Sequence, residues 1–170
     1  MSLISEQYRK EQQRLHSAGN YGITGSKFGP VVSDMVNKTG SKTLLDYGCG
    51  RNRSLLKALD CDVQYIGYDP GVEEYSAEPP ACDAVACIDV LEHIEPELLD
   101  NVLDHIRSKT LKHALLTIHT GPAVKTLSDG RNAHLIQEPP RWWLPKIWDR
   151  WELRSFVRTP DGFVVAVSVS

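Results

Sequence analysis

The sequence predicts an α/β domain of three layers, with helices covering both faces of a mostly parallel sheet. Four apolar runs of strand type, at 43–47, 63–68, 83–88 and 114–118, alternate with segments in which leucine and valine recur at helical spacing. After the fourth run this alternation stops. Two β-rich segments there flank a turn at 159–162 that contains proline and glycine, which predicts a closing antiparallel hairpin.

Helices are expected at four places between and before these runs. The first covers 4–17 and is mostly solvated, because it is rich in Glu, Gln and Arg. The second covers 28–38 and ends before Gly40. The third and fourth cover 52–59 and 96–108, where apolar residues follow helical spacing.

Length and composition predict one globular domain over residues 1–170, divided into an N-terminal helical cap (1–40), a core, and a substrate-side loop and lid (119–148). The formal net charge of −3 does not favour extended binding to nucleic acid. The four cysteines form no CxxC pair, which favours buried reduced thiols. No segment has the ~18 consecutive apolar residues of a membrane span. We therefore expect a cytoplasmic protein that does not bind membranes.

A glycine-rich turn follows the first strand-like run, in the order Gly48, Cys49, Gly50. Glycines at such a turn let backbone N–H groups approach a ligand, and a helix N-terminus beyond it favours polar or anionic groups. The second run ends at Asp69, about 20 residues further on, where a carboxylate can accept hydrogen bonds from both hydroxyls of a ribose. The pattern predicts a nucleoside-containing ligand across the strand ends.

Two other interpretations of this turn stay open. The dinucleotide fingerprint needs a further glycine at position 53, where this chain has Arg53, and the closing hairpin also departs from a dinucleotide-binding fold. These differences disfavour a nicotinamide cofactor, which stays as a less favoured alternative. The other alternative is a tight strand-to-helix turn that binds no ligand.

Three segments, 44–50, 66–70 and 86–94, resemble the successive motifs of class I S-adenosylmethionine-dependent methyltransferases. The resemblance covers about 43–118, and the hairpin matches the family's reversed last strand. It implies a Rossmann-like fold with a mixed sheet of the seven-stranded type. We expect an abbreviated version here, because 71–82 is too short for a full helix-strand-helix insertion.

The same resemblance implies a cofactor site for S-adenosylmethionine. Near the methionine part and the ribose it places Asp46, Gly48, Gly50 and Asp69, and near the sulfonium it places Asp89 and Val90. Cys49 and Pro70 complete the expected cofactor site, because they adjoin these residues. The family often has a third glycine where this chain has Asn52, a residue type that tolerates a left-handed backbone.

Glu92 and His93 follow the third strand-like run and are the first candidates for catalysis, as a base or a substrate anchor. They could instead only stabilise their loop. Asp89, Glu92 and His93 stand at i, i+3 and i+4, so one helical turn would gather them around a metal, with His119 or His134 completing the site.

This spacing resembles the Glu-x-x-Glu-His of small-RNA 3′-end 2′-O-methyltransferases, with Asp89 in place of the first glutamate. The Glu-His pair also resembles that of many metal-free methyltransferases of quinones and other small molecules. We expect no metal ligand in this chain and keep the metal site as the alternative.

The loop after the fourth strand-like run is expected to form the acceptor side of the site. Arg131 and His134 are candidates for catalysis, and Tyr21, His119 and Asn132 for binding the substrate. The alternative is a solvated lid that does not contact substrate. All four tryptophans lie between 142 and 151, where we expect packing more than stacking on a base or a sugar.

The sequence thus predicts methyl transfer from S-adenosylmethionine to oxygen or nitrogen of a polar acceptor. Methyl transfer requires mainly alignment of the nucleophile, methyl group and sulfur, so few catalytic side chains are needed. The expected acceptor is a small molecule, a nucleotide or a sugar. The alternative function is a non-catalytic module of the same fold that binds the cofactor or a protein partner.

Overall fold

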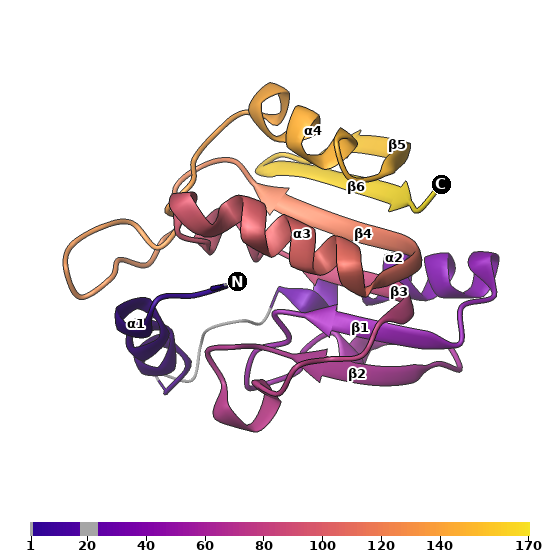
Figure 1. The fold of residues 1–170 in the computed structure, drawn as a ribbon, viewed down its shortest axis with the longest axis horizontal. Coiled ribbons are helices and arrows are strands. Elements are labelled where there is room, and N and C mark those ends of the chain that lie inside the picture. The colour runs from indigo at the N-terminus through magenta and orange to yellow at the C-terminus, as the bar shows by residue number, and fades with distance from the viewer. Residues whose placement is uncertain (1, 18–23) are drawn as a thin grey trace.

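A computed structural model describes residues 2–17 and 24–170, and its described part contains one six-stranded sheet in the order β2-β1-β3-β4-β6-β5 (Figure 1). The strands β1 to β4 run parallel, β6 is antiparallel to β4, and β5 is antiparallel to β6. This arrangement confirms the expected mixed sheet and closing hairpin. The strands are β1 (Thr43–Tyr47), β2 (Gln64–Tyr68), β3 (Cys82–Ile88), β4 (Thr110–His119), β5 (Glu152–Arg158) and β6 (Gly162–Ser168).

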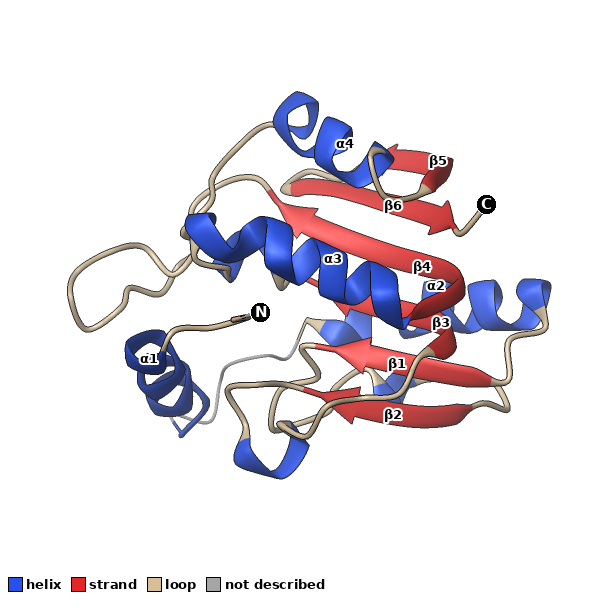
Figure 2. Cartoon of the chain, viewed as in Figure 1, coloured by secondary structure: helices blue, strands red, loops and turns tan. Residues whose placement is uncertain are grey.

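Four α-helices and four short 3-10 helices accompany the sheet in the described residues (Figure 2). Among these residues, no helix is both long and apolar enough to cross a membrane. The α-helices are α1 (Glu6–Ser17), α2 (Gly25–Thr39), α3 (Leu99–Lys109) and α4 (Pro140–Trp148). The 3-10 helices are η1 (Leu56–Ala58), η2 (Glu73–Tyr75), η3 (Leu91–His93) and η4 (Pro96–Leu98).

The sheet separates two hydrophobic clusters, because successive side chains of a strand point to opposite faces. On β1, Leu44 packs in the cluster that contains Val32 of α2. Its neighbour Leu45 packs in the cluster that contains Leu103 of α3 and Trp143 of α4. Helix α2 therefore covers one face of the sheet and α3 and α4 cover the other, which gives the three expected layers (Figure 1).

Helix α2 ends where the sequence predicts. Gly40 adopts a left-handed conformation with φ of 62°, and its N–H donates to the carbonyl oxygens of Val36 and Asn37. A residue without Cβ takes this conformation without steric cost, so glycine terminates the helix. The helix begins earlier than expected, at Gly25.

The helix predicted at 52–59 does not form. Turns occupy most of this segment, and only Leu56–Ala58 make a short 3-10 helix. The sequence analysis expected the left-handed backbone at Asn52. The residue with positive φ is instead its neighbour Arg53, with φ of 44°. A left-handed residue interrupts a right-handed helix, so the chain leaves the glycine turn as an irregular loop.

The segment between β2 and β3 explains why the sheet has six strands. It contains only the 3-10 helix Glu73–Tyr75, in place of the helix-strand-helix insertion of the larger sheet. The abbreviated sheet that the sequence predicts follows from this short connection. Strand β2 is consequently an edge of the sheet.

Two of the four tryptophans pack as expected. Trp143 is fully buried under α4, and its Nε1 donates to the carbonyl oxygen of Glu138 at 3.0 Å. Trp151, just before β5, is also buried. Trp148, in contrast, is 51% exposed on the same helix as Trp143.

Trp143→Ala should lower the free energy of unfolding by about 3–5 kcal/mol, because it leaves a large cavity between α4 and the sheet. The matched control is Trp148→Ala, which removes the same side chain from a half-exposed position and should cost about 1 kcal/mol or less. Chemical denaturation of both variants measures the difference. Equal losses would show that the core under α4 does not depend on Trp143.

Candidate active site

A cavity of about 610 Å³ opens at the carboxyl ends of the parallel strands. Its wall includes a residue at or just beyond the end of each strand: Gly48 for β1, Asp69 for β2, Asp89 for β3 and His119 for β4. Open α/β sheets bind ligands at this edge, and the volume is typical of a small-molecule site. The candidate residues that follow successive strands in the sequence therefore all line the same cavity.

The turn after β1 is tied to the end of β2. The N–H groups of Gly48 and Cys49 both donate to the carbonyl oxygen of Tyr68, at 2.7 and 3.1 Å. Gly48 has φ of 84°, and a Cβ at this position would collide with the side chain of Val90. Glycine is thus required both for the turn and for the close approach of Val90, which lines the cavity after β3.

The Asp69 carboxylate joins this turn to the loop that follows β2. Its Oδ2 accepts from the N–H of Gly50 at 3.0 Å, and its Oδ1 accepts from the N–H of Gly71 at 2.8 Å. His16 Nε2 of α1 lies 3.8 Å from Oδ2. Burial raises the pKa of Asp69, while His16 and the two backbone donors oppose that rise. Pro70 lines the cavity beside it.

Asp46, the last but one residue of β1, is a second buried carboxylate on the cavity wall. Its Oδ2 accepts from the hydroxyl of Tyr65 at 2.7 Å. Burial raises the pKa of Asp46 to about 7, and the Asp69 charge adds to this effect. A ligand with a positive charge would hold Asp46 ionised, because an opposite charge nearby favours the charged form.

Three imidazoles, His93, His119 and His134, line the other side of the cavity. The ring centroids of His93 and His134 are 4.6 Å apart, and those of His119 and His134 are 4.8 Å apart. Burial lowers the pKa of His93 to about 3 and also lowers the pKa of His134. Both of these rings are therefore neutral at physiological pH.

Asp89 stands between the two sides of the cavity in a left-handed conformation, with φ of 51°. The hydroxyl of Thr117 donates to its Oδ1 at 2.6 Å, and the N–H of Asp89 lies 2.9 Å from that same hydroxyl oxygen. Such a conformation is uncommon for a residue with a Cβ and concentrates at functional sites. Thr117 on β4 holds Asp89 in place.

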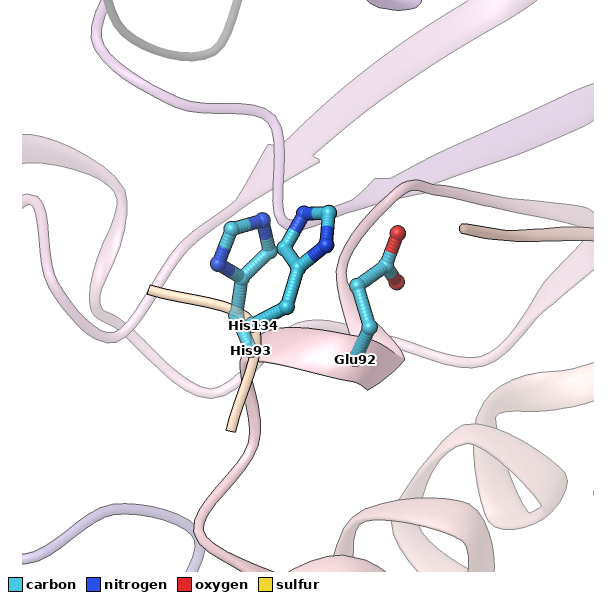
Figure 3. Close-up of side chains that lie close together, drawn as sticks. All are labelled: Glu92, His93 and His134. Atoms are coloured by element: carbon cyan, nitrogen blue, oxygen red, sulfur yellow. The ribbon is translucent and has the colours of Figure 1, made fainter. Parts of the chain in front are cut away.

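Glu92 is fully buried and lies behind the cavity wall in the 3-10 helix η3 (Figure 3). Its Oε1 accepts from the N–H of His119 at 2.8 Å, and its Oε2 has no hydrogen-bond partner among the described residues. Burial raises the pKa of Glu92 well above its usual value, and Asp89 adds to this. Glu92 thus positions the backbone of His119.

The structure does not bring Arg131 or Asn132 into the cavity. Arg131 is exposed and pairs with Asp129 at 2.8 Å. The Asn132 Oδ1 accepts from the N–H groups of Ala123 and His134, both at 2.9 Å, so this side chain shapes the loop that carries His134. Tyr21, the remaining candidate, lies outside the described residues.

Helix α1 contributes cavity residues that the sequence analysis missed. Most of the helix is exposed, as expected, but Tyr8, Gln12 and His16 are buried and line the cavity. The Tyr8 hydroxyl donates to the carbonyl oxygen of His93 at 2.6 Å, which fixes α1 against the histidine side. Their spacing of four residues marks one helix face, but two of the three are polar, which hid the pattern.

The chain belongs to the methyltransferase domain family, whose model matches residues 26–158. No curated protein matches the chain by sequence. The cofactor is S-adenosylmethionine, the methyl donor of this family. The residues present fit it: buried Asp46 and Asp69 face the cavity, where an ammonium group and ribose hydroxyls would supply the donors they accept.

Solved structures show the same fold at low sequence identity. The 1,6-didemethyltoxoflavin-N1-methyltransferase of Burkholderia thailandensis, with bound 1,6-didemethyltoxoflavin and S-adenosylhomocysteine, has a TM-score of 0.66 and 14% identity over 100% of this chain and 92% of that chain. The magnesium protoporphyrin IX methyltransferase of Synechocystis PCC 6803, with S-adenosylmethionine bound, has a TM-score of 0.59 and 15% identity over 98% and 86%. An O-methyltransferase family protein of Burkholderia thailandensis has a TM-score of 0.60 and 13% identity over 100% and 64%.

Asp46→Asn should stabilise the cofactor-free protein increasingly as the pH rises. The folded protein holds the Asp46 proton to about pH 7, whereas the unfolded chain releases it near pH 4. The wild type therefore loses stability between these values, and the asparagine variant does not. We expect a difference of roughly 2–4 kcal/mol at pH 8 that shrinks toward pH 4.

Denaturation curves from pH 4 to 8 measure this difference, with the exposed Asp62→Asn as the matched control. A stability difference that is the same at pH 4 and pH 8 would contradict the account of Asp46.

Proposed function

We propose that this protein transfers the methyl group of S-adenosylmethionine to an oxygen or nitrogen of a polar small molecule, nucleotide or sugar. The single observation that carries the proposal is the shared cavity. Asp46, Gly48 and Asp69 line one side of it, and His93 and His134 line the other. A methyl donor held by the first group would face an acceptor held by the second.

The cofactor side has one group for each part of the donor. Asp69 would accept from the ribose hydroxyls, since each of its oxygens makes one backbone hydrogen bond and has a second lone pair. Asp46 would pair with the ammonium group of the methionine part. Val90 packs against Gly48 and, with Asp89, would lie near the sulfonium.

The acceptor side offers neutral imidazole nitrogens. Bound cofactor supplies an electrophilic methyl group. The acceptor atom would form a bond to this carbon while the carbon–sulfur bond breaks, and the sulfonium would leave as a neutral thioether. An acceptor hydroxyl or protonated amine also loses its proton. The His134 Nδ1 faces the carbonyl oxygen of Gly121 at 2.7 Å, so Nε2 carries the lone pair that can accept that proton.

The test is formation of S-adenosylhomocysteine with a panel of hydroxyl and amine acceptors that includes nucleosides and sugars. We expect turnover with at least one class of acceptor. Binding of S-adenosylmethionine without turnover across the panel would instead indicate a non-catalytic module of this fold.

With an active acceptor, His134→Ala should lower kcat at least tenfold, a change of ~1.4 kcal/mol or more in the barrier, and spare cofactor affinity. Arg131→Ala is the matched control from the same loop, because this exposed side chain pairs with Asp129 outside the cavity. It should keep kcat within twofold. A large loss in the Arg131 variant, with none in the His134 variant, would contradict the assigned acceptor side.

A further inference from the structure

Three potential metal ligands converge at the histidine side of the cavity. One ligand-type atom from each of Glu92, His93 and His134 lies within 4.8 Å of the other two. Glu92 and His93 come from the 3-10 helix η3, and His134 comes from the long loop after β4 (Figure 3). Side chains from two segments that are far apart in the sequence are thus gathered at one point.

The two imidazoles are hydrogen-bonded as metal ligands are. His93 Nδ1 lies 2.8 Å from the carbonyl oxygen of Ala133, and His134 Nδ1 lies 2.7 Å from the carbonyl oxygen of Gly121. A carbonyl oxygen only accepts, so each Nδ1 carries the proton and each Nε2 carries the lone pair. Metal-ligating histidines almost always donate their second N–H to such a partner, which fixes ring and tautomer.

Glu92 supplies the independent observation. Its carboxylate is fully buried, and Oε2 has no hydrogen-bond partner among residues 2–17 and 24–170. Leaving a buried polar atom without a partner costs free energy, so an orphaned atom indicates a missing partner. A cation between this oxygen and the two imidazoles would supply it.

We propose that Glu92, His93 and His134 bind a divalent transition-metal ion such as Mn²⁺, Co²⁺ or Zn²⁺. Two imidazoles and one carboxylate suit these ions, whereas Mg²⁺ and Ca²⁺ favour oxygen ligands. Ligand atoms on one ion stand roughly 3.0–3.5 Å apart when the bonds are ~2.1 Å long, so the three side chains must close by about 1–2 Å.

This site differs from both interpretations of the sequence. The expectation was no metal ligand, and the alternative gathered Asp89, Glu92 and His93 with His119 or His134, so the structure keeps three of those residues and leaves out Asp89. The structure instead engages the Asp89 Oδ1 with the hydroxyl of Thr117. His119 does not belong to the cluster of three converging side chains.

The proposed ion would face the acceptor. His93 and His134 line the cavity, and Glu92 lies behind them, so the remaining coordination positions point into the cavity. Resting on the proposed function, we infer that the acceptor is a hydroxyl compound whose oxygen completes the coordination. With the ion bound, the His134 Nε2 lone pair would be a ligand and no longer a proton acceptor. The ion would instead lower the pKa of that hydroxyl, whose proton would pass to solvent while the oxygen takes the methyl group.

The test is Co²⁺ binding to chelator-treated full-length protein, followed by calorimetry and by the visible absorption bands of the bound ion. We expect one Co²⁺ per chain, with binding at least tenfold weaker in Glu92→Gln and in His134→Asn. Glu92→Gln keeps an oxygen to accept from the N–H of His119, and His134→Asn covers the case in which the first variant does not fold.

His113→Asn and Asp89→Asn are the controls, because they remove a histidine outside the cavity and a carboxylate engaged by Thr117. Both should bind Co²⁺ as the wild type does. No Co²⁺ binding to the wild type, or equal binding in the Glu92 and His134 variants, would overturn the proposed site.

The activity assay separates this inference from the proposed function. Co²⁺ bound at this site with no turnover on any acceptor would leave the site standing and contradict the methyltransferase proposal. If the protein binds no Co²⁺ and still turns over an acceptor in the presence of a chelator, the metal site is wrong and the methyltransferase proposal stands.

Discussion

The two backbone hydrogen bonds that the Asp69 carboxylate accepts are the interactions on which the geometry of the site depends most. This carboxylate accepts from Gly50 on one side and Gly71 on the other, and so joins the turn after β1 to the loop after β2. Both strands belong to a parallel sheet, whose carboxyl ends all emerge at one edge. Because hydrogen bonds to a carboxylate are stronger than neutral ones, one side chain holds both loops around the cavity.

The cavity walls divide the chemistry between acids and bases. Asp46 and Asp69 lie on the proposed cofactor side, where burial raises their pKa values and makes a positively charged partner favourable. His93 and His134 lie opposite, where burial lowers their pKa values and keeps the imidazoles neutral. This arrangement suits methyl transfer from a sulfonium. The acidic wall would favour the positively charged donor, and the neutral imidazoles would not compete with it for that charge.

Sequence analysis predicted the sheet, and the residues it proposed for the cofactor side do line the cavity, because both expectations depend on local patterns. Gly48 and Asp69 stand at strand ends that the apolar runs delimit. The acceptor side was harder, since burial there comes from distant contacts: Arg131 and His134 looked equivalent in the sequence, yet only His134 turns inward. The α1 face with Gln12 was missed for the same reason, because polar residues at helical spacing give no hydrophobic signal.

The central claim is that cofactor and acceptor share one cavity, with the transferable methyl group directed at the histidines. The most direct measurement is nuclear magnetic resonance of the complex with S-adenosylmethionine labelled with ¹³C at this methyl group. The account predicts nuclear Overhauser effects from the methyl protons to the ring protons of His134 or His119, and none to those of His113. Effects confined to residues outside the cavity would contradict it.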